Sequence, residues 1–384
     1  MKSIAILAFP APGHAQGITN LAEELLNKGH KVRIYIPADG KKLIHGTQAQ
    51  VTILDPATLP AGALKGLAGK TLASSGLSSF LRGFRYLKLL NETSARLELE
   101  LGTDVLLYDS LYLRPPGNFR GTRVCYSSAA SYFPDVQGKY PPLIANSSKV
   151  TELFLVLMNW IIRPRKVLKQ VLSPDWHLVL NSIQIIQEKN LASKTVATGP
   201  LIDLAKISPT RKENMVYVSL GTLVDTERKI HLLKDIQKVC EKKKIPTIIS
   251  WGAWDADQTP ALASTPFAQV VGRVDQLEVL HRAKLMITHG GLNSVQECIV
   301  TETPMIVIPL KHDQHFVASR IEKLGLGRVV RPGSGFEKKL EQALELEINF
   351  SRQQALQLQK GNMLTAGGMK AATEFITSLQ VSHS

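Results

Sequence analysis

The sequence predicts an α/β protein made of two doubly wound parallel-sheet domains, and three observations support this. Its 384 residues exceed the roughly 250–300 residues over which one hydrophobic core stays compact. Short runs rich in Val and Ile alternate with helical patterns from the first residue onward, which is typical of βαβ units. A charged, weakly periodic stretch at 201–214 separates two strand-forming halves. We expect the two sheets to face each other across a cleft.

The predicted strands fall into two sets, one in each domain. In the first domain, residues 1–200, strands are expected at 3–9, 31–37, 50–54, 104–109, 121–126 and 176–180. After the linker 201–214, the second domain, residues 215–384, has strands expected at 215–220, 246–251, 268–272, 285–288 and 304–308. Helical patterns lie between them, and we also consider that the last helix packs back on the first domain.

Two segments of the first domain predict long amphipathic helices instead of strands. Apolar residues recur at helical spacing in 70–102 and in 150–172, and a basic flank follows the second segment. Such a face usually belongs to the core. The alternative is that this face lines a groove for a hydrophobic acceptor molecule or forms a membrane-interfacial patch.

The composition indicates a soluble globular protein. Hydrophobic residues make up 44% of the chain and charged residues 20%, and no uncharged apolar run reaches the roughly 18 residues of a membrane-spanning helix. The apolar start, residues 3–9, is interpreted as a buried strand because it is shorter than the apolar region of a signal peptide. Three widely spaced cysteines indicate neither a disulfide framework nor a zinc site, so a cytoplasmic location is expected.

The formal charge of +14 is concentrated in the first domain. Residues 1–200 hold about 23 Lys and Arg against about 13 Asp and Glu. This excess serves solubility, contact with an anionic membrane surface, or binding of an acidic acceptor. Nucleic acid is not an expected partner, because the chain has no recognisable nucleic-acid-binding motif.

A glycine-rich turn predicts an anion-binding helix start. The residues HGGLNSVQE at 289–297 follow a predicted strand and open a helix. Glycine lets the backbone approach an anion, and the N–H groups and dipole of a helix start favour negative charge. Glu297 lies one turn after Asn293 on the same helix face, where it can accept hydrogen bonds from ribose hydroxyls. A purely steric role for the glycines is the alternative.

Other strand ends carry polar residues that complete a family pattern. Ser219-Leu220-Gly221-Thr222 ends one predicted strand, and Asp313-Gln314 follows another after a short loop. Together with QLEVL at 276–280, HGGLNSVQE at 289–297 and TPM at 303–305, these residues resemble the donor signature of the family-one nucleotide-diphospho-sugar glycosyltransferases, which have the GT-B fold. The resemblance is dense over 215–330 and thinner over the first 200 residues.

The resemblance implies roles for individual residues of the second domain. It assigns His289, Asn293 and Ser294 to the diphosphate, Glu297 to the ribose, and Asp313 with Gln314 to the hexose hydroxyls. The donor-binding candidates together are Ser219, Gly221, Thr222, Arg273, Gln276, His289, Gly291, Asn293, Ser294, Glu297, Asp313 and Gln314.

The chain departs from the family where a tryptophan often stacks on the nucleobase. The corresponding loop reads GRVDQ at 272–276, so Arg273 takes that place. Its planar guanidinium can stack on a base, or it can be a solvated surface residue. The identity of the base is therefore left open.

His14 and Asp109 are the candidate catalytic residues. His14 lies in PGHAQG at 12–17, which we place between the first strand and the first helix, and Asp109 ends the predicted strand 104–109. Imidazole titrates near neutral pH and can take a proton from a hydroxyl, and a carboxylate on the other ring nitrogen would orient it. In the resembled family such a dyad acts in an inverting displacement. Asp109 capping a turn is the alternative, and Gly17 stands where the family often has proline.

The expected function is transfer of a hexose from a UDP-sugar to a hydroxyl of a hydrophobic small-molecule or lipid-like acceptor, and glucose is the expected sugar. No acidic DxD-type pair occurs in a donor loop, so we expect no required metal and no cofactor besides the donor substrate. One alternative is a non-catalytic nucleotide-sugar-binding auxiliary protein. A nicotinamide-dependent oxidoreductase is disfavoured, because no GxGxxG follows either first strand.

Overall fold

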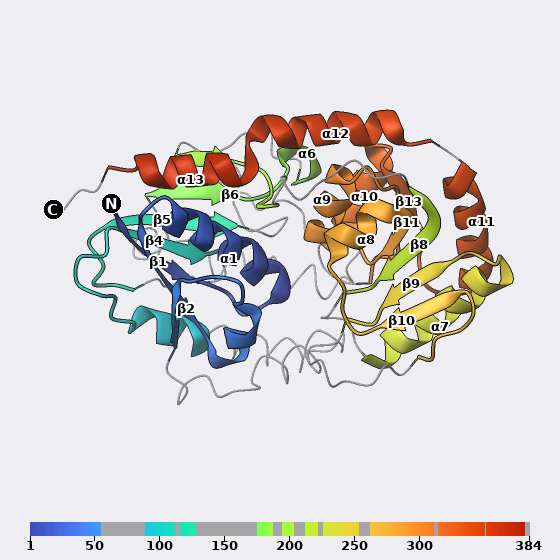
Figure 1. The fold of residues 1–384 in the computed structure, drawn as a ribbon, viewed down its shortest axis with the longest axis horizontal. Helices are drawn as coiled ribbons and strands as arrows, with labels where there is room; N and C mark the ends of the chain where they lie inside the picture. Colours follow the sequence, from blue (N-terminus) through green and yellow to red (C-terminus); the bar gives the residue numbers. More distant parts are fainter. Residues whose placement is uncertain are drawn as a thin grey trace, which may run out of the picture. The chain divides into compact units, whose positions relative to one another are not determined.

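The computed structural model describes the chain in segments that together define two α/β units. The described residues are 1–54, 89–110, 112, 116–127, 175–186, 194–202, 212–221, 226–252, 262–310, 314–349 and 351–380. One unit comprises Met1–Ile183, Glu188–Ile202 and Ala366–Ser384, and the other comprises Gln184–Gln187 and Asp203–Thr365. We call them the first and the second unit (Figure 1).

The first unit contains a parallel sheet in the order β3-β2-β1-β4-β5-β6-β7. Its strands are β1 (Ser3–Leu7), β2 (Lys31–Ile36), β3 (Gln50–Ile53), β4 (Val105–Asp109), β5 (Thr122–Ser127), β6 (Trp176–Val179) and β7 (Thr195–Ala197). The strand order reverses between β1 and β4, whose register pairs Leu7 with Tyr108. In doubly wound sheets ligands bind beyond the carboxyl ends of the strands at this switch point.

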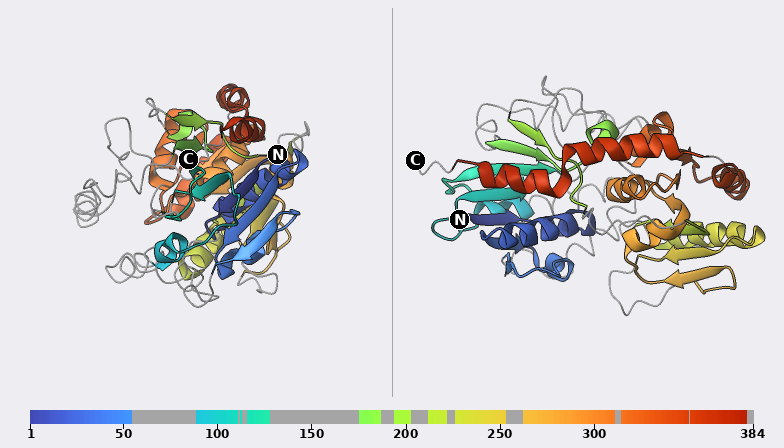
Figure 2. Two further views of the ribbon diagram at one scale, coloured as in Figure 1. Left: turned by 90° about the vertical axis from the view of Figure 1, so that its left-hand side faces the viewer. Right: turned by 45° about the horizontal axis from the view of Figure 1, so that its top comes forward.

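Helices from opposite ends of the chain cover one face of the first sheet (Figure 2). Apolar side chains of α1 (Pro12–Asn27) and of α13 (Gly368–Ser378) share a core with alternate residues of β1, β2, β4, β5 and β6. The Lys2 ammonium donates hydrogen bonds to the carbonyls of Ile376 (3.2 Å) and Leu379 (2.6 Å) and to that of Thr377. The last helix of the chain is thereby part of the first unit.

The second unit repeats the architecture with the sheet order β10-β9-β8-β11-β12-β13. Its strands are β8 (Glu213–Ser219), β9 (Thr247–Ser250), β10 (Ala268–Val271), β11 (Ala283–Thr288), β12 (Met305–Val307) and β13 (Gly327–Val329), all parallel to their neighbours. The order reverses between β8 and β11, where Ser219 pairs with Thr288. The prediction of two parallel-sheet α/β domains is confirmed.

The helices of the second unit pack on both faces of its sheet. The apolar sides of α7 (Thr226–Lys242) and α11 (Phe336–Asn349) join one core with β8, β9, β11 and β12. The others are α8 (Gln276–Arg282), α9 (Leu292–Val300), α10 (Gln314–Lys323) and α12 (Gln353–Ala366). Shorter helical segments among the described residues include η1 (Ala38–Leu43) and α6 (Ile183–Ile186).

The start of α1 and the strands β7 (Thr195–Ala197) and β13 (Gly327–Val329) differ from what the sequence predicts. Helix α1 begins at Pro12, so His14 lies in its first turn and not in a loop before it; proline favours this position because its fixed φ suits a helix start. The strands β7 and β13 were not predicted, because three-residue edge strands show no periodic pattern. No membrane-spanning helix is found among the described residues.

The long helix predicted for 70–102 is described only at its end. Residues 89–95 are helical, and the helix ends well before the predicted limit. The hydroxyls of Thr93 and Ser94 donate to the carbonyls of Leu89 (3.0 Å) and Asn91 (3.1 Å), a local bonding pattern that competes with helix continuation. The segments 70–88 and 150–172 lie outside the described residues.

Candidate active site

His14 and Asp109 meet at the switch point of the first sheet. Asp109 is the last residue of β4, and His14 follows the neighbouring strand β1 by way of the start of α1. Because parallel strands end at the same sheet edge, residues 95 positions apart come into contact. The His14 Nδ1 lies 2.7 Å from the Asp109 Oδ2.

The environment of this pair orients the imidazole. The Asp109 side chain is fully buried, whereas 19% of the His14 side chain is exposed. An ionised carboxylate only accepts hydrogen bonds, so Nδ1 carries the proton in this contact and Nε2 is the basic nitrogen. The Phe9 ring packs against the imidazole with centroids 5.3 Å apart. The arrangement can take a proton from a hydroxyl and stabilise the resulting imidazolium.

Two buried tyrosines hold the end of β1 in place and had not been predicted as part of the site. The Tyr112 hydroxyl donates to the Ala8 carbonyl (3.0 Å), and the Tyr126 hydroxyl donates to the Leu7 carbonyl (3.4 Å). Burial, followed by the charge of Asp109, raises the pKa of Tyr126 well above its ordinary value. The Tyr126 hydroxyl therefore acts as a neutral donor. Their positions gave no sequence signal, because a tyrosine in a strand usually only packs.

The His289 ring lies between two glycines at the switch point of the second sheet. A Cβ on Gly221 would lie 2.7 Å from the His289 Cε1, and a Cβ on Gly291 would lie 2.8 Å from the same atom. Gly221 also has a φ of +75°, which disfavours other residues. Burial lowers the pKa of His289 to about 4, so the ring is neutral near pH 7. These glycines thus have a steric role toward the ring.

Helix α9 begins at this edge with a start that suits an anion. Gly291 is its N-cap and supplies no side-chain hydrogen bond, and Asn293 and Ser294 lie in the first turn. The first N–H groups of a helix have no partner within the helix and carry its positive partial charge. Ser219 ends the adjacent strand β8. The start of α9 therefore offers backbone N–H groups and polar side chains to an anion, and the phosphate site stays a prediction.

Three of the predicted donor residues form one hydrogen-bonded cluster. The Gln276 Nε2 donates to the Ser294 Oγ (2.9 Å) and to the Glu297 carboxylate. Burial raises the pKa of Glu297 to about 7, although the bond from Gln276 opposes this shift. Tyr217, which had not been predicted, donates through its hydroxyl to the Gln276 Oε1 (3.2 Å). Tyr217 lies within the buried strand β8, where a tyrosine usually only packs, so the sequence gave no sign of this contact.

The remaining donor candidates are placed separately. Gln314 begins α10, and its Oε1 accepts a hydrogen bond from the Leu310 N–H (2.9 Å). Arg273 is exposed in the turn between β10 and α8. Thr222 and Asp313 lie outside the described residues. No group of three or more His, Cys, Asp or Glu positioned to hold a metal ion occurs in the described segments.

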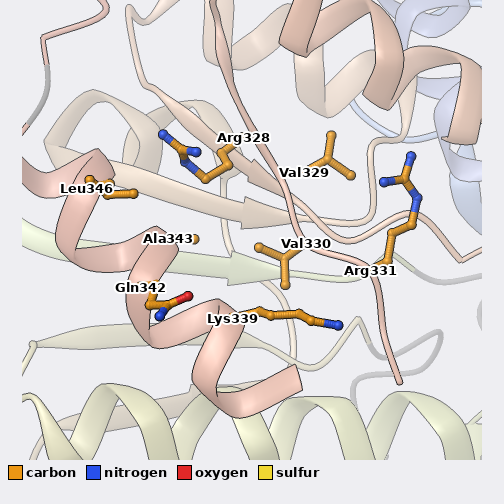
Figure 3. Close-up of a pocket in the computed structure, with 8 residues that line it drawn as sticks. All are labelled: Arg328, Val329, Val330, Arg331, Lys339, Gln342, Ala343 and Leu346. Carbon is orange, nitrogen blue, oxygen red and sulfur yellow. The ribbon is translucent and has the colours of Figure 1, made fainter. Parts of the chain in front are cut away.

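A separate cavity of about 340 Å³ lies between β13 and α11 (Figure 3). Its lining includes the cationic residues Arg328, Arg331 and Lys339. None of the predicted donor residues lines it. Arg328 bonds to the buried Glu347 carboxylate (3.2 Å), and Lys339 donates to the Ser334 carbonyl (3.0 Å). We therefore place the candidate site at the switch points and not in this cavity.

Known proteins resemble this chain along its whole length. The family model "Glycosyltransferase family 28 C-terminal domain" matches residues 230–373. The zeaxanthin glucosyltransferase of Pantoea ananas is 26% identical over 98% of this chain and 95% of its own length. The solved structure of the glycotransferase of kitacinnamycin covers 98% of each chain with a TM-score of 0.72 at 18% identity. That of the glycosyltransferase VinC in complex with dTDP covers 98% of each with a TM-score of 0.66 at 14% identity.

The matches agree on a common class. At their low identity the two solved structures show the fold alone, whereas the family model and the full-length relative concern the activity. The matching family model is that of family 28, whereas the donor signature suggested family one. Both are glycosyltransferase families, and the chain resembles the UDP-sugar glycosyltransferases, has two α/β units as in the GT-B fold and is an enzyme of the glycosyltransferase class.

Proposed function

We propose that this enzyme transfers glucose from a UDP-sugar to a hydroxyl group of an apolar small-molecule or lipid-like acceptor, with inversion at the anomeric carbon. The observation that carries the proposal is the 2.7 Å contact between the His14 Nδ1 and the Asp109 Oδ2. It leaves Nε2 as the basic nitrogen of a side chain that is partly exposed. The similarity to the zeaxanthin glucosyltransferase of Pantoea ananas supports glucose as the sugar and an acceptor of this kind.

In the proposed reaction His14 acts as a general base. Its Nε2 takes the proton of the acceptor hydroxyl while the hydroxyl oxygen forms a bond to the anomeric carbon. The bond from that carbon to the diphosphate oxygen breaks on the opposite face, and its electron pair leaves with the nucleoside diphosphate. Asp109 holds the tautomer and stabilises the imidazolium as it forms.

The second unit binds the donor in this proposal. The start of α9, with Asn293 and Ser294, faces the diphosphate, and helix N–H groups take up the charge of the leaving group. Glu297 accepts from the ribose, and Gln314 with Asp313 binds the hexose. Arg273 stacks on the base, and dTDP in the VinC structure makes thymidine nucleotides the donors to compare with uridine nucleotides. These groups neutralise the negative charge of the diphosphate without a required metal.

The decisive experiment replaces His14 with Ala. Transfer to a panel of apolar alcohols is followed by mass spectrometry, with UDP-glucose and dTDP-glucose as donors. We expect kcat to fall by roughly 10²–10⁴-fold, the usual contribution of a positioned general base. UDP binding should be retained, because His14 belongs to the first unit. Undiminished turnover in His14→Ala would remove the assigned role.

A matched control is His45→Ala. His45 also belongs to the first unit. Its Nδ1 lies 3.2 Å from the Leu43 carbonyl, a contact that does not involve Asp109. This variant should transfer glucose at the rate of the unchanged enzyme. A loss equal to that of His14→Ala would indicate that the effect of the latter comes from damage to the unit.

Two further parts of the proposal concern location. A cytoplasmic location agrees with the three free cysteines, all of which are buried.

The second part is peripheral contact between the basic first domain and an anionic membrane. Sedimentation with vesicles of phosphatidylserine and phosphatidylcholine, compared with phosphatidylcholine alone, tests it. Equal binding to both would contradict an electrostatic contact.

A further inference from the structure

Lys229 is a buried lysine that the proposed function leaves without a role. It lies near the start of α7, and only 4% of its surface is exposed. Its ammonium lies 4.6 Å from the centroid of the Trp251 ring and donates to the Gly221 carbonyl at 3.5 Å, the long limit of a hydrogen bond. Burying an ammonium is costly unless another charge compensates it.

The ends of three adjacent strands meet at this ammonium. Gly221 follows β8, Trp251 follows β9, and His289, whose ring lies against Gly221, follows β11. These strands are neighbours in the sheet, and β8 and β11 flank the switch point. Lys229 thus lies at the ligand-binding edge of the sheet.

The described contacts of Lys229 are with neutral groups. The Gly221 carbonyl and the Trp251 ring carry no net charge, and the His289 ring is neutral because its pKa is lowered to about 4. The Trp251 Nε1 beside it is buried and has no hydrogen-bond partner among the described residues. A methionine of similar length would pack on the Trp251 indole without the cost of desolvating an ammonium. A bound anionic ligand would therefore explain why a charged side chain is buried at this position.

We propose that Lys229 supplies positive charge that holds the diphosphate of the donor at the start of α9. This inference rests on the proposed function, since it assumes a nucleoside diphosphate at that edge. Lys229 is then a positioning residue. It acts through its hydrogen bond to the Gly221 carbonyl and through its electric field. Its effect is specific to phosphate charge, and the nucleoside part of the ligand does not depend on it.

The test compares ligands that differ only in phosphate. Affinities for UDP, dTDP and uridine are measured by calorimetry and ligand-observed NMR for the unchanged enzyme, Lys229→Met and Lys229→Arg. We expect Lys229→Met to bind UDP about tenfold more weakly, because the variant lacks one positive charge near the diphosphate. Its affinity for uridine should be unchanged, and Lys229→Arg should retain most of the UDP affinity. Lys234→Met, an exposed lysine on the same helix, is the control and should match the unchanged enzyme.

The pH dependence supplies a readout that packing alone would not change. Burial lowers the pKa of Lys229 to about 8, so the affinity for UDP should fall above that pH as the ammonium loses its proton. Arginine stays charged, so Lys229→Arg should lack this fall. His289 is neutral over this range, and Glu297, with a pKa of about 7, affects both proteins alike.

The outcomes separate this inference from the function on which it rests. If the unchanged enzyme binds neither UDP nor dTDP, the proposed donor site itself is wrong. If it binds UDP and Lys229→Met binds UDP equally well, Lys229 has no part in holding the diphosphate. Equal weakening of UDP and uridine in Lys229→Met would assign the lysine a structural role and overturn the inference.

Discussion

The side chains of Gln276 and Glu297, 21 positions apart in sequence, are joined by a hydrogen bond from the Gln276 amide to the Glu297 carboxylate. Gln276 begins α8 and Glu297 lies in α9, so the bond links two helices on one face of the second sheet. Because burial raises the pKa of Glu297 to about 7, this link contains a carboxyl group that changes charge near neutral pH.

Donor affinity should therefore increase as the pH rises through about 7. Below that pH the Glu297 carboxyl is protonated, and above it the carboxylate is the stronger acceptor for ribose hydroxyls. Titration of UDP between about pH 6 and 8 should show the increase in the unchanged enzyme and not in Glu297→Gln, whose affinity should be about tenfold lower at the upper end. Glu278→Gln, an exposed change in α8, is the control. An unaltered increase in Glu297→Gln would identify another titrating group.

Replacing Asp109 with Asn should lower kcat by roughly 10²–10⁴-fold while the affinity for UDP stays the same. The amide cannot stabilise an imidazolium as a carboxylate does, and it can bind the wrong tautomer of His14. Initial rates and calorimetry measure the two effects. Asp104→Asn is a matched control, because Asp104 precedes the same strand at its opposite end and accepts from the Ser3 N–H (2.7 Å). Equal loss in both variants would contradict a specific role for Asp109.

Gly221→Ala should destabilise the second unit by about 2 kcal/mol and weaken UDP binding. The new Cβ would have a positive φ and would lie 2.7 Å from the His289 ring, which must then move. Gly335→Ala shares the positive φ (+71°) but has no heavy atom within 4 Å of its Cβ. Comparing their unfolding in urea isolates the clash. If the two variants lose the same stability, the ring contact contributes nothing.

Lys2→Met should lower the free energy of unfolding of the first unit by about 1–2 kcal/mol. The ammonium donates to carbonyls at the end of α13, where cations are favoured by the helix dipole. Amide exchange at Ile376 and Leu379 should quicken. Lys31→Met, an exposed change, should leave both measurements unaltered. Unchanged exchange in Lys2→Met would show that packing alone holds α13.

The sequence predicted those parts of the fold that are encoded by local patterns. The Val- and Ile-rich runs at β1, β4, β8 and β11 are buried strands, and two parallel sheets follow from their alternation with helices. Edge strands such as β13 escaped prediction, since three residues packed by one neighbouring strand leave no periodicity. The end of helix 89–95 depended on hydroxyl contacts that no spacing reveals.

The site was predictable where chemistry follows a strand end. His14, Asp109 and Ser294 were expected because the carboxyl ends of parallel strands gather at one edge of a sheet. Tyr217, Tyr126 and Lys229 were not expected, because their side chains reach the sites from inside strands or a helix, and only the packing shows where such groups point. The roles of all these residues stay predictions, and Thr222 and Asp313 also lie outside the described residues.

The course of the chain at α13 has a consequence for synthesis on the ribosome. Ala372, Ile376 and Leu379 complete the core around α1 and β1, yet they are translated after the whole second unit. Part of the apolar surface of the first unit therefore stays uncovered until residues 366–380 have left the exit tunnel. Fragments separated at 202–212 would likewise leave that core unfinished unless residues 366–380 were supplied in trans.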